Sequence, residues 1–376
     1  MRVLFLSDDF PPESFGGAGI STYELAKGFQ KAGHEVFVIT TVRNEADAGE
    51  SVYEGLKIFK ITSNYSEKWR AYRSLYNPPV LNKLEEILKK ISPELVHINN
   101  IHYHLSYHSI KIAKEYSKKV FLTFRDAMAF SYGKLKTKKY LEDFDAHLSY
   151  LDQVRQAKKR WNPLRNFVIK RYLKEADQLF AVSAALRTAL EQNGIKNVGV
   201  IHTGIDLSQY PPAYNEHGKR IFFAGRLSGA KGVGVVEKVM QKVSRALPEA
   251  ELMTAGAHGR WLNREDMNRA YATADVVLVP SICFDAFPRT VLEAMAMGKS
   301  VLATHYGGAR EAIEDGVTGY VVNPFDIETM ADKIIDLLKD KEKAERFGKA
   351  SRERIKTHFN LNDRIDKLVK IYEGLS

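Results

Sequence analysis

Two carboxylates lie on either side of a predicted loop-to-helix transition in the C-terminal half of the chain. Asp285 lies in the loop, and Glu293 lies near the start of a helix predicted over 290–297. A carboxylate in such a place can accept two hydrogen bonds from a cis-diol, and a helix N-terminus can receive an anion. A short apolar strand is predicted next, over 300–304. This order predicts a ligand site at the carboxyl end of a parallel sheet.

A glycine-rich loop, GRLSGAKG over 225–232, follows another predicted strand and carries two cations. Gly225 lets the backbone approach a ligand, and Arg226 and Lys231 supply fixed positive charge. Cations placed around a departing diphosphate stabilise the transition state more than the ground state. Taken alone, the loop is a surface turn with two solvated charges. Its order and distance relative to the two carboxylates favour a diphosphate site.

The stretch from Asp285 to Glu293 resembles the donor-binding signature of retaining nucleotide-sugar glycosyltransferases with the GT-B fold, family 4 (glycosyl transferases group 1). That family carries Glu-x7-Glu and Ala-Met-Ala, with Phe-Gly just after the first Glu, whereas this chain reads Asp-x7-Glu with Phe-Pro. The resemblance implies that Asp285 contacts hydroxyls of the donor sugar, Glu293 holds the ribose, and the two loop cations hold the diphosphate. An N-terminal-turn Glu favoured by the helix dipole is the alternative for Glu293.

The resemblance implies two sets of site residues. The catalytic set is Arg125, Arg226, Lys231, Asp285 and Glu293, and the donor-binding set is Gly16, Gly17, Gly225, Arg226, Lys231, Trp261, Phe287, Pro288, Arg289 and Glu293. The glycines Gly16, Gly17 and Gly19 precede a predicted helix. Their backbone N–H groups can meet a phosphate or the acceptor, or they form a flexible helix start.

Two departures from the family pattern bear on the donor. Asp285 is one methylene shorter than the Glu that it replaces, so a tighter loop or a water keeps the contact, or the site selects a different sugar. The stretch 256–271 runs almost directly into the next helix, where the family inserts a helix and a strand. Trp261 could replace the lost contacts by stacking on the base, or fill the space left in the domain. The choice among UDP, GDP and ADP therefore stays open.

A third departure is Arg125, in the sequence LTFRD after a predicted strand, where relatives commonly carry a His. A guanidinium stays protonated and cannot act as a base. Retaining transfer by front-face attack needs no protein base, because the leaving phosphate oxygen can take the acceptor proton. Arg125 could hold an anionic group of the acceptor or donor, or pair with Asp126 and shape the cleft.

Histidines gather at His97, His102, His104 and His108. The last two are spaced for one face of a helix, which would suit a metal, but no further ligands are evident. The family resemblance also implies a metal-independent catalyst. The prediction is therefore no metal and no cofactor, with a nucleotide-diphosphate sugar as donor substrate.

Strands and helices alternate along the chain, which predicts an α/β fold with doubly wound parallel sheets. Strands are predicted at 3–7, 35–40, 56–61, 95–98, 120–124, 178–182, 198–201, 221–224, 252–255, 276–279 and 300–304. Helices are predicted at 20–32, 80–91, 106–117, 184–192, 233–247 and 290–297, with three helical stretches in 327–375 and a helical segment over 133–175.

The resemblance implies GT-B architecture, in which two Rossmann-like domains face a cleft. The expected N-terminal, acceptor-binding domain covers 1–212, and the C-terminal, nucleotide-sugar-binding domain covers 213–359 and is shortened near 256–271. Pro211 and Pro212 mark a stiff linker between them. The last helix, about 360–376, is expected to cross back onto the N-terminal domain.

Composition sets further bounds. The chain has 376 residues, 44% of them hydrophobic, which suits two domains. Its one cysteine, Cys283, rules out a disulfide framework and suits a reducing compartment. The N-terminal MRVLFLSDDF is too short an apolar run for a signal peptide, and no run nears the roughly 20 residues that span a bilayer. The protein is expected in the cytoplasm, with the inner face of the cell membrane as one place of action.

The net charge of +10 is concentrated in one segment. Residues 134–174 hold 12 Lys and Arg against 4 Asp and Glu, a net +8, with Tyr140, Tyr150, Trp161, Phe167 and Tyr172 between them. Such a segment could face anionic lipid headgroups or nucleic acid, or be a solvated helical face. No nucleic-acid-binding module is evident, so no nucleic-acid partner is expected.

These features favour a retaining glycosyltransferase of the hexosyltransferase type. It would move a sugar from a nucleotide-diphosphate sugar to a saccharide or lipid-linked acceptor, and peripheral contact with an anionic membrane would involve 134–174. The alternative is a catalytically degenerate GT-B protein that acts as a nucleotide-sugar-binding protein or a partner subunit, because a fold does not fix a function.

Overall fold

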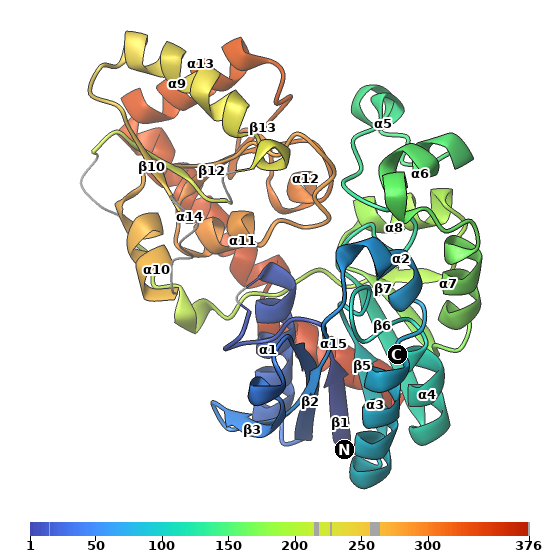
Figure 1. Ribbon diagram of the computed structural model, residues 1–376. Helices are drawn as coiled ribbons and strands as arrows, with labels where there is room; N and C mark the ends of the chain where they lie inside the picture. The colour runs from blue at the N-terminus through green and yellow to red at the C-terminus, as the bar shows by residue number, and fades with distance from the viewer. Residues whose placement is uncertain (15, 214–217, 226–227, 256–263, 375–376) are drawn as a thin grey trace. The chain divides into compact units, whose positions relative to one another are not determined.

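The chain folds into two compact units, each built around its own sheet (Figure 1). The computed structural model describes residues 1–14, 16–213, 218–225, 228–255 and 264–374. The first unit comprises Met1–Thr137, Asp145–His202 and Asn362–Ser376, and the second comprises Lys138–Phe144 and Thr203–Leu361. The chain therefore passes between the units more than once.

The first unit has an eight-stranded sheet. In spatial order its strands are β3 (Gly49–Tyr53), β4 (Leu56–Thr62), β2 (Glu35–Val42), β1 (Arg2–Leu6), β5 (Leu95–Ile98), β6 (Lys119–Phe124), β7 (Gln178–Ala181) and β8 (Val198–Val200). All neighbours are parallel except β3 and β4. The strand order reverses between β1 and β5, and such a switch point is where open α/β sheets bind ligands.

Eight α-helices of the described residues belong to the first unit. They are α1 (Gly17–Lys31), α2 (Arg70–Arg73), α3 (Pro78–Ile91), α4 (Ser109–Tyr116), α6 (Tyr150–Ala157), α7 (Arg165–Leu173), α8 (Ala184–Gln192) and α15 (Leu361–Glu373). In α3, Leu81, Leu84, Leu88 and Ile91 recur at helical spacing and are buried. Tyr372 of α15 packs on Phe29 and Phe121, so the last helix completes the core of this unit.

The second unit has a five-stranded parallel sheet. Its order is β10 (Glu251–Thr254), β9 (Arg220–Phe223), β11 (Val276–Val279), β12 (Ser300–Thr304) and β13 (Gly319–Val322). Its helices are α5 (Lys138–Asp143), α9 (Val233–Ala246), α10 (Arg264–Thr273), α11 (Arg289–Ala296), α12 (Ala309–Ala312), α13 (Ile327–Lys339) and α14 (Lys341–His358). The order reverses between β9 and β11, which is the switch point of this sheet.

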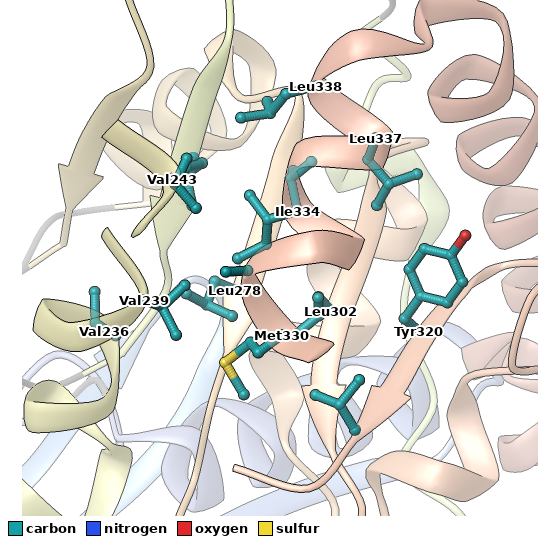
Figure 2. Close-up of a cluster of buried hydrophobic side chains, with 14 of the residues drawn as sticks. Val236, Val239, Val243, Leu278, Leu302, Tyr320, Met330, Ile334, Leu337 and Leu338 are labelled. Atoms are coloured by element: carbon teal, nitrogen blue, oxygen red, sulfur yellow. The ribbon is translucent and has the colours of Figure 1, made fainter. Parts of the chain in front are cut away.

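The core of the second unit lies between the sheet and the helices α9 and α13 (Figure 2). Val239 and Val243 of α9 meet Ile334 and Leu338 of α13 above Leu278 of the central strand, all fully buried. Burying these side chains is the main driving force that holds the strands in register. The predicted class, α/β with two doubly wound parallel sheets, is confirmed by the two sheets.

The segment predicted as helical over 133–175 is divided. Helix α5 belongs to the second unit, whereas α6, the 3-10 turn η3 (Lys158–Arg160) and α7 belong to the first. Tyr140, expected among the aromatic residues available to a membrane, is buried at 3% exposure. Its ring lies 5.6 Å from Phe284 and 5.8 Å from Tyr306. Tyr140 is therefore a packing residue of the second unit.

Within the part of the chain that the structure describes, no helix is long and apolar enough to span a membrane.

Candidate functional site

The carboxyl ends of β9 and β11 bring two predicted residues together in the second unit. Lys231 follows β9, and Asp285 follows β11, on the two sides of the switch point. The Lys231 ammonium donates a hydrogen bond to Oδ2 of Asp285. Both side chains stay partly exposed. A carboxylate and an ammonium therefore lie at the edge where a ligand of this sheet would bind.

The backbone around Asp285 is fixed by two loops that touch. Its C=O accepts from Gly308 N–H at 2.9 Å, and Asp285 forms a β-bridge with Gly307. Gly307 has φ +91°, and a Cβ placed on it would lie 1.9 Å from the backbone carbonyl oxygen of Asp285. Only glycine fits this approach. Ser281 Oγ lies 3.3 Å from Asp285 Oδ2.

Helix α9 begins beside this pair. Gly232, its N-cap residue, has φ +84°, and a Cβ there would lie 2.0 Å from Pro280 O. Among the described residues, the N–H groups of Val233 and Gly234 have no hydrogen-bond acceptor, as is usual in the first turn of a helix. Free N–H groups and the helix dipole together favour an anion at this end.

Glu293 of α11 is held by three donors. Its Oε1 accepts from Arg289 Nε at 2.7 Å and from the Tyr210 hydroxyl at 3.3 Å, and its Oε2 accepts from the Tyr271 hydroxyl at 2.9 Å. The Glu293 side chain is 14% exposed. Burial, followed by the Glu293 charge, raises the pKa of Tyr271 well above its ordinary value, so its hydroxyl stays a donor. Sequence reasoning missed Tyr210 and Tyr271, which lie outside the motif.

The other residues of this unit that were predicted to bind the donor substrate include both buried and undescribed positions. Phe287 is buried and its ring lies 5.7 Å from Phe359, while Pro288 occupies the N-cap position of α11 without a side-chain capping bond. Gly225 follows β9, and a Cβ built on it would meet its nearest atom at 3.6 Å, an ordinary van der Waals contact. The predicted residues Arg226 and Trp261 lie outside the described residues.

In the first unit, a buried aspartate orders the loop at the switch point. Asp8 follows β1, and its carboxyl accepts from the N–H groups of His104 (2.9 Å), Leu105 (2.7 Å) and Tyr103 (2.7 Å). Burial raises the pKa of Asp8 to about 7, although the three N–H donors oppose this shift. The sequence signal was present, because Asp8 directly follows an apolar strand, but no role was predicted for it.

Arg125 follows β6 and donates from Nε to Asn99 Oδ1 at 3.1 Å, beside the end of β5. Asp126 accepts from Met128 N–H at 2.8 Å, and its Oδ2 lies 3.6 Å from His102 Nε2. Burial lowers the pKa of His102 to about 4, so the imidazole is neutral at pH 7.

The expectation that His104 and His108 share a helix face is wrong. His104 lies in the loop before α4 and its Nδ1 is 2.7 Å from Ser63 Oγ, whereas His108 is the N-cap residue and its Nδ1 is 2.9 Å from the Tyr172 hydroxyl. In the described ranges, no group of three or more His, Cys, Asp or Glu side chains is placed to hold a metal ion.

Gly16 and Gly17 lie at the start of α1. Gly16 is the N-cap residue and has no side chain that could form a capping hydrogen bond. Gly19, one turn on, would place a Cβ 3.1 Å from Asp9 O. Gly19 therefore lets α1 lie directly against the chain that leaves β1.

Two family models cover most of the chain. Glycosyltransferase Family 4 matches residues 15–209, and Glycosyl transferases group 1 matches residues 209–354. Among curated proteins, spore coat protein SA of Bacillus subtilis is 25% identical over 219 residues, which cover 46% of this chain and 58% of that protein. Glycogen synthase of Mycobacterium tuberculosis is 23% identical over an alignment 403 residues long, which covers 96% of this chain and 91% of that protein.

A solved structure shares the fold. Anabaena HepE in complex with UDP and glucose superposes with a TM-score of 0.70 at 17% identity, over all of both chains. The fold is therefore GT-B. The two family matches, which follow one another along the sequence and meet at residue 209, place this chain in glycosyltransferase family 4, among the glycosyl transferases group 1.

Proposed function

We propose that the protein is a retaining glycosyltransferase that transfers a sugar from a nucleotide-diphosphate sugar to a saccharide or lipid-linked acceptor, without a metal ion. One observation carries the proposal most: Lys231 and Asp285 meet at the switch point of the second sheet, beside the start of α9. The family membership and the relatives' names support sugar transfer.

The diphosphate would lie between Lys231 and the first N–H groups of α9, with Arg226 as a further cation. Negative charge grows on the diphosphate as the glycosidic bond breaks. A preplaced ammonium and helix N-terminus stabilise that charge without reorganising at the moment of reaction. The UDP in the HepE structure supports a nucleoside diphosphate as the carrier.

Asp285 would contact the sugar hydroxyls, and Glu293 would hold the ribose. Asp285 is partly exposed and its backbone is fixed by the Gly307 loop, so its carboxylate has a defined position. The acceptor hydroxyl would attack from the side of the departing diphosphate, and its proton would pass to the phosphate oxygen. This step requires no protein base, which is compatible with Arg125 in the first unit.

The proposal is tested by the melting temperature of the purified protein with UDP, GDP or ADP. A ligand that binds only the folded state at 100 times its Kd stabilises by about 2.7 kcal/mol. We expect one nucleotide to raise the melting temperature, Lys231→Met to abolish most of the rise, and Lys238→Met to keep it. Lys238 is an exposed lysine of α9, the helix that begins two residues after Lys231, which makes it a matched control.

The transfer step is tested with the matching nucleotide sugars and a panel of saccharide and lipid-linked acceptors. Retention of the donor's anomeric configuration in the product, read by NMR, is the expected result. Inversion would contradict the mechanism. Donor binding with no transfer to any acceptor would favour a nucleotide-sugar-binding protein instead.

A further inference from the structure

The carboxylate of Glu293 has little hydrogen-bonding capacity left. An ionised carboxylate offers about four acceptor positions, two on each oxygen. Arg289 and Tyr210 use both positions of Oε1, and Tyr271 uses one of Oε2. Within the described part of the chain, one position on Oε2 therefore stays open.

A ribose presents two neighbouring hydroxyls, and this step rests on the proposed function, in which Glu293 holds them. One hydroxyl fits the open position on Oε2. The other must enter at Oε1, where the two existing contacts differ. The Arg289 contact is charge-assisted and 2.7 Å long, whereas the Tyr210 contact, at 3.3 Å, is longer than the usual 2.5–3.0 Å of an O–H···O bond. The Tyr210 contact is therefore the one that yields.

We propose that Tyr210 is a ribose-binding residue, and that one ribose hydroxyl inserts between its hydroxyl and Glu293. A hydroxyl both donates and accepts, so the inserted group donates to Oε1 and accepts from Tyr210. The Tyr210 oxygen still accepts from Arg289 Nη2, at 2.9 Å. One long contact is replaced by two hydrogen bonds of ordinary length.

The backbone holds Tyr210 in place for this role. Its C=O accepts from Arg352 Nη1 at 2.7 Å, and the preceding Gln209 C=O accepts from Asn268 Nδ2 at 2.9 Å. Tyr210 lies in the segment between β8 and β9, far along the sequence from the Asp-x7-Glu motif. Nucleotide binding would therefore involve the connector of the chain as well as the motif.

The test measures the Kd of UDP, GDP and ADP, each with its 2′-deoxy and 3′-deoxy analogues, for wild type, Tyr210→Phe and Tyr271→Phe. Losing one hydrogen bond between neutral groups lowers affinity about 2- to 10-fold. We expect Tyr210→Phe to show this loss for the ribonucleotide and for one deoxy analogue. The analogue that lacks the inserting hydroxyl should bind wild type and Tyr210→Phe equally well.

Tyr271→Phe is the matched control, because it makes the same change on the other oxygen of Glu293. It should weaken all three nucleotides by a similar factor. An unchanged or tighter ribonucleotide affinity in Tyr210→Phe, or an equal loss for all three ligands, would overturn the inference. A misfolded variant would be seen by circular dichroism and would lose every ligand. If wild type binds no nucleotide, the proposed function fails first.

Discussion

At the scale of single residues, Asp8 shows how a buried charge can order a loop and couple it to pH. Its carboxyl, at 2% exposure, receives three backbone N–H groups, which favour the ionised form, while burial disfavours it more strongly. The result is a pKa of about 7, against an ordinary 3.8. The carboxyl that orders this loop therefore gains or loses its proton near neutral pH.

The first prediction concerns the stability that this carboxyl contributes. Between about pH 4 and pH 7 the folded state keeps a proton that the unfolded chain loses, so the Asp8 contribution to the free energy of unfolding falls as pH rises. His97, His102 and His104 act in the opposite direction, because burial lowers their pKa values. The difference between wild type and Asp8→Asn therefore isolates Asp8.

The free energy of unfolding is measured in urea from pH 4 to pH 8 for both proteins. As pH rises, the value for wild type minus the value for Asp8→Asn should fall by on the order of a few kcal/mol. It should level off above pH 7. Asp47→Asn, at an exposed carboxyl of the same unit, is the control. A difference that is flat across this range would show that Asp8 is already ionised in the folded protein.

The limits of sequence reasoning are also clear at this scale. Lys231 and Asp285 were predicted as one site because their types and spacing follow a motif, and the sheet brings them together. The Tyr210 and Tyr271 hydroxyls were not predicted, because their shared partner Glu293 is 83 and 22 residues away. Tyrosine has no motif of its own, so only the fold reveals such contacts.

At the scale of elements, periodicity predicted most strands and helices within a few residues, since buried faces repeat every 2 or 3.6 positions. β13 was missed because it is short and begins with Gly319, a residue typical of turns. Its glycine is required by packing, since a Cβ there would lie 2.1 Å from Val301 O. β3, GESVY, was missed because it is a polar edge strand.

Helix α5 was predicted as part of a helical segment, but the residues against which it packs were not predicted. Tyr140 packs on Phe284 and Tyr306, the Tyr306 hydroxyl donates to Leu141 O at 3.0 Å, and the Arg310 guanidinium lies 5.1 Å over the Phe144 ring. Phe284 and Tyr306 adjoin Asp285 and Gly307, which form the β-bridge at the candidate site. This helix therefore supports the two loops that fix Asp285.

The second prediction is that Tyr140→Ala lowers both stability and transfer. Removing a buried aromatic ring costs about 3–5 kcal/mol, and the loops around Asp285 lose their support. We expect a lower melting temperature and a lower kcat for sugar transfer, with the Kd of the nucleoside diphosphate changed much less. Val52→Ala, at a side chain that is 70% exposed on the edge strand β3, should change neither. Equal kcat values for the two variants would show that α5 does not support the loops around Asp285.

At the scale of the whole molecule, charge and exposed apolar groups are unevenly distributed. Residues 134–174 carry +8 of the net +10. Large apolar side chains exposed on the first unit include Trp69, Tyr72, Tyr150, Leu151, Leu164 and Phe167. Two of them contact Trp161: the Tyr72 hydroxyl donates to the Trp161 C=O at 3.2 Å, and the Tyr150 ring lies 5.1 Å from the Trp161 indole. Cations and aromatic rings together are typical of surfaces that bind anionic membranes.

The third prediction is that this surface binds anionic lipid, as a lipid-linked acceptor would require. Each Lys near a charged membrane contributes about 1 kcal/mol, so Lys158→Glu with Lys159→Glu should lower the partition coefficient roughly 30-fold or more. Lys341→Glu with Lys356→Glu, an equal charge change on α14 of the second unit, is the control and should have a much smaller effect.

The measurement is co-sedimentation with vesicles containing phosphatidylserine, compared with neutral vesicles, at low and high salt. Binding should fall with salt because the attraction is screened. Wild type that stays in the supernatant at low salt would contradict membrane binding and leave a soluble saccharide as the acceptor to test.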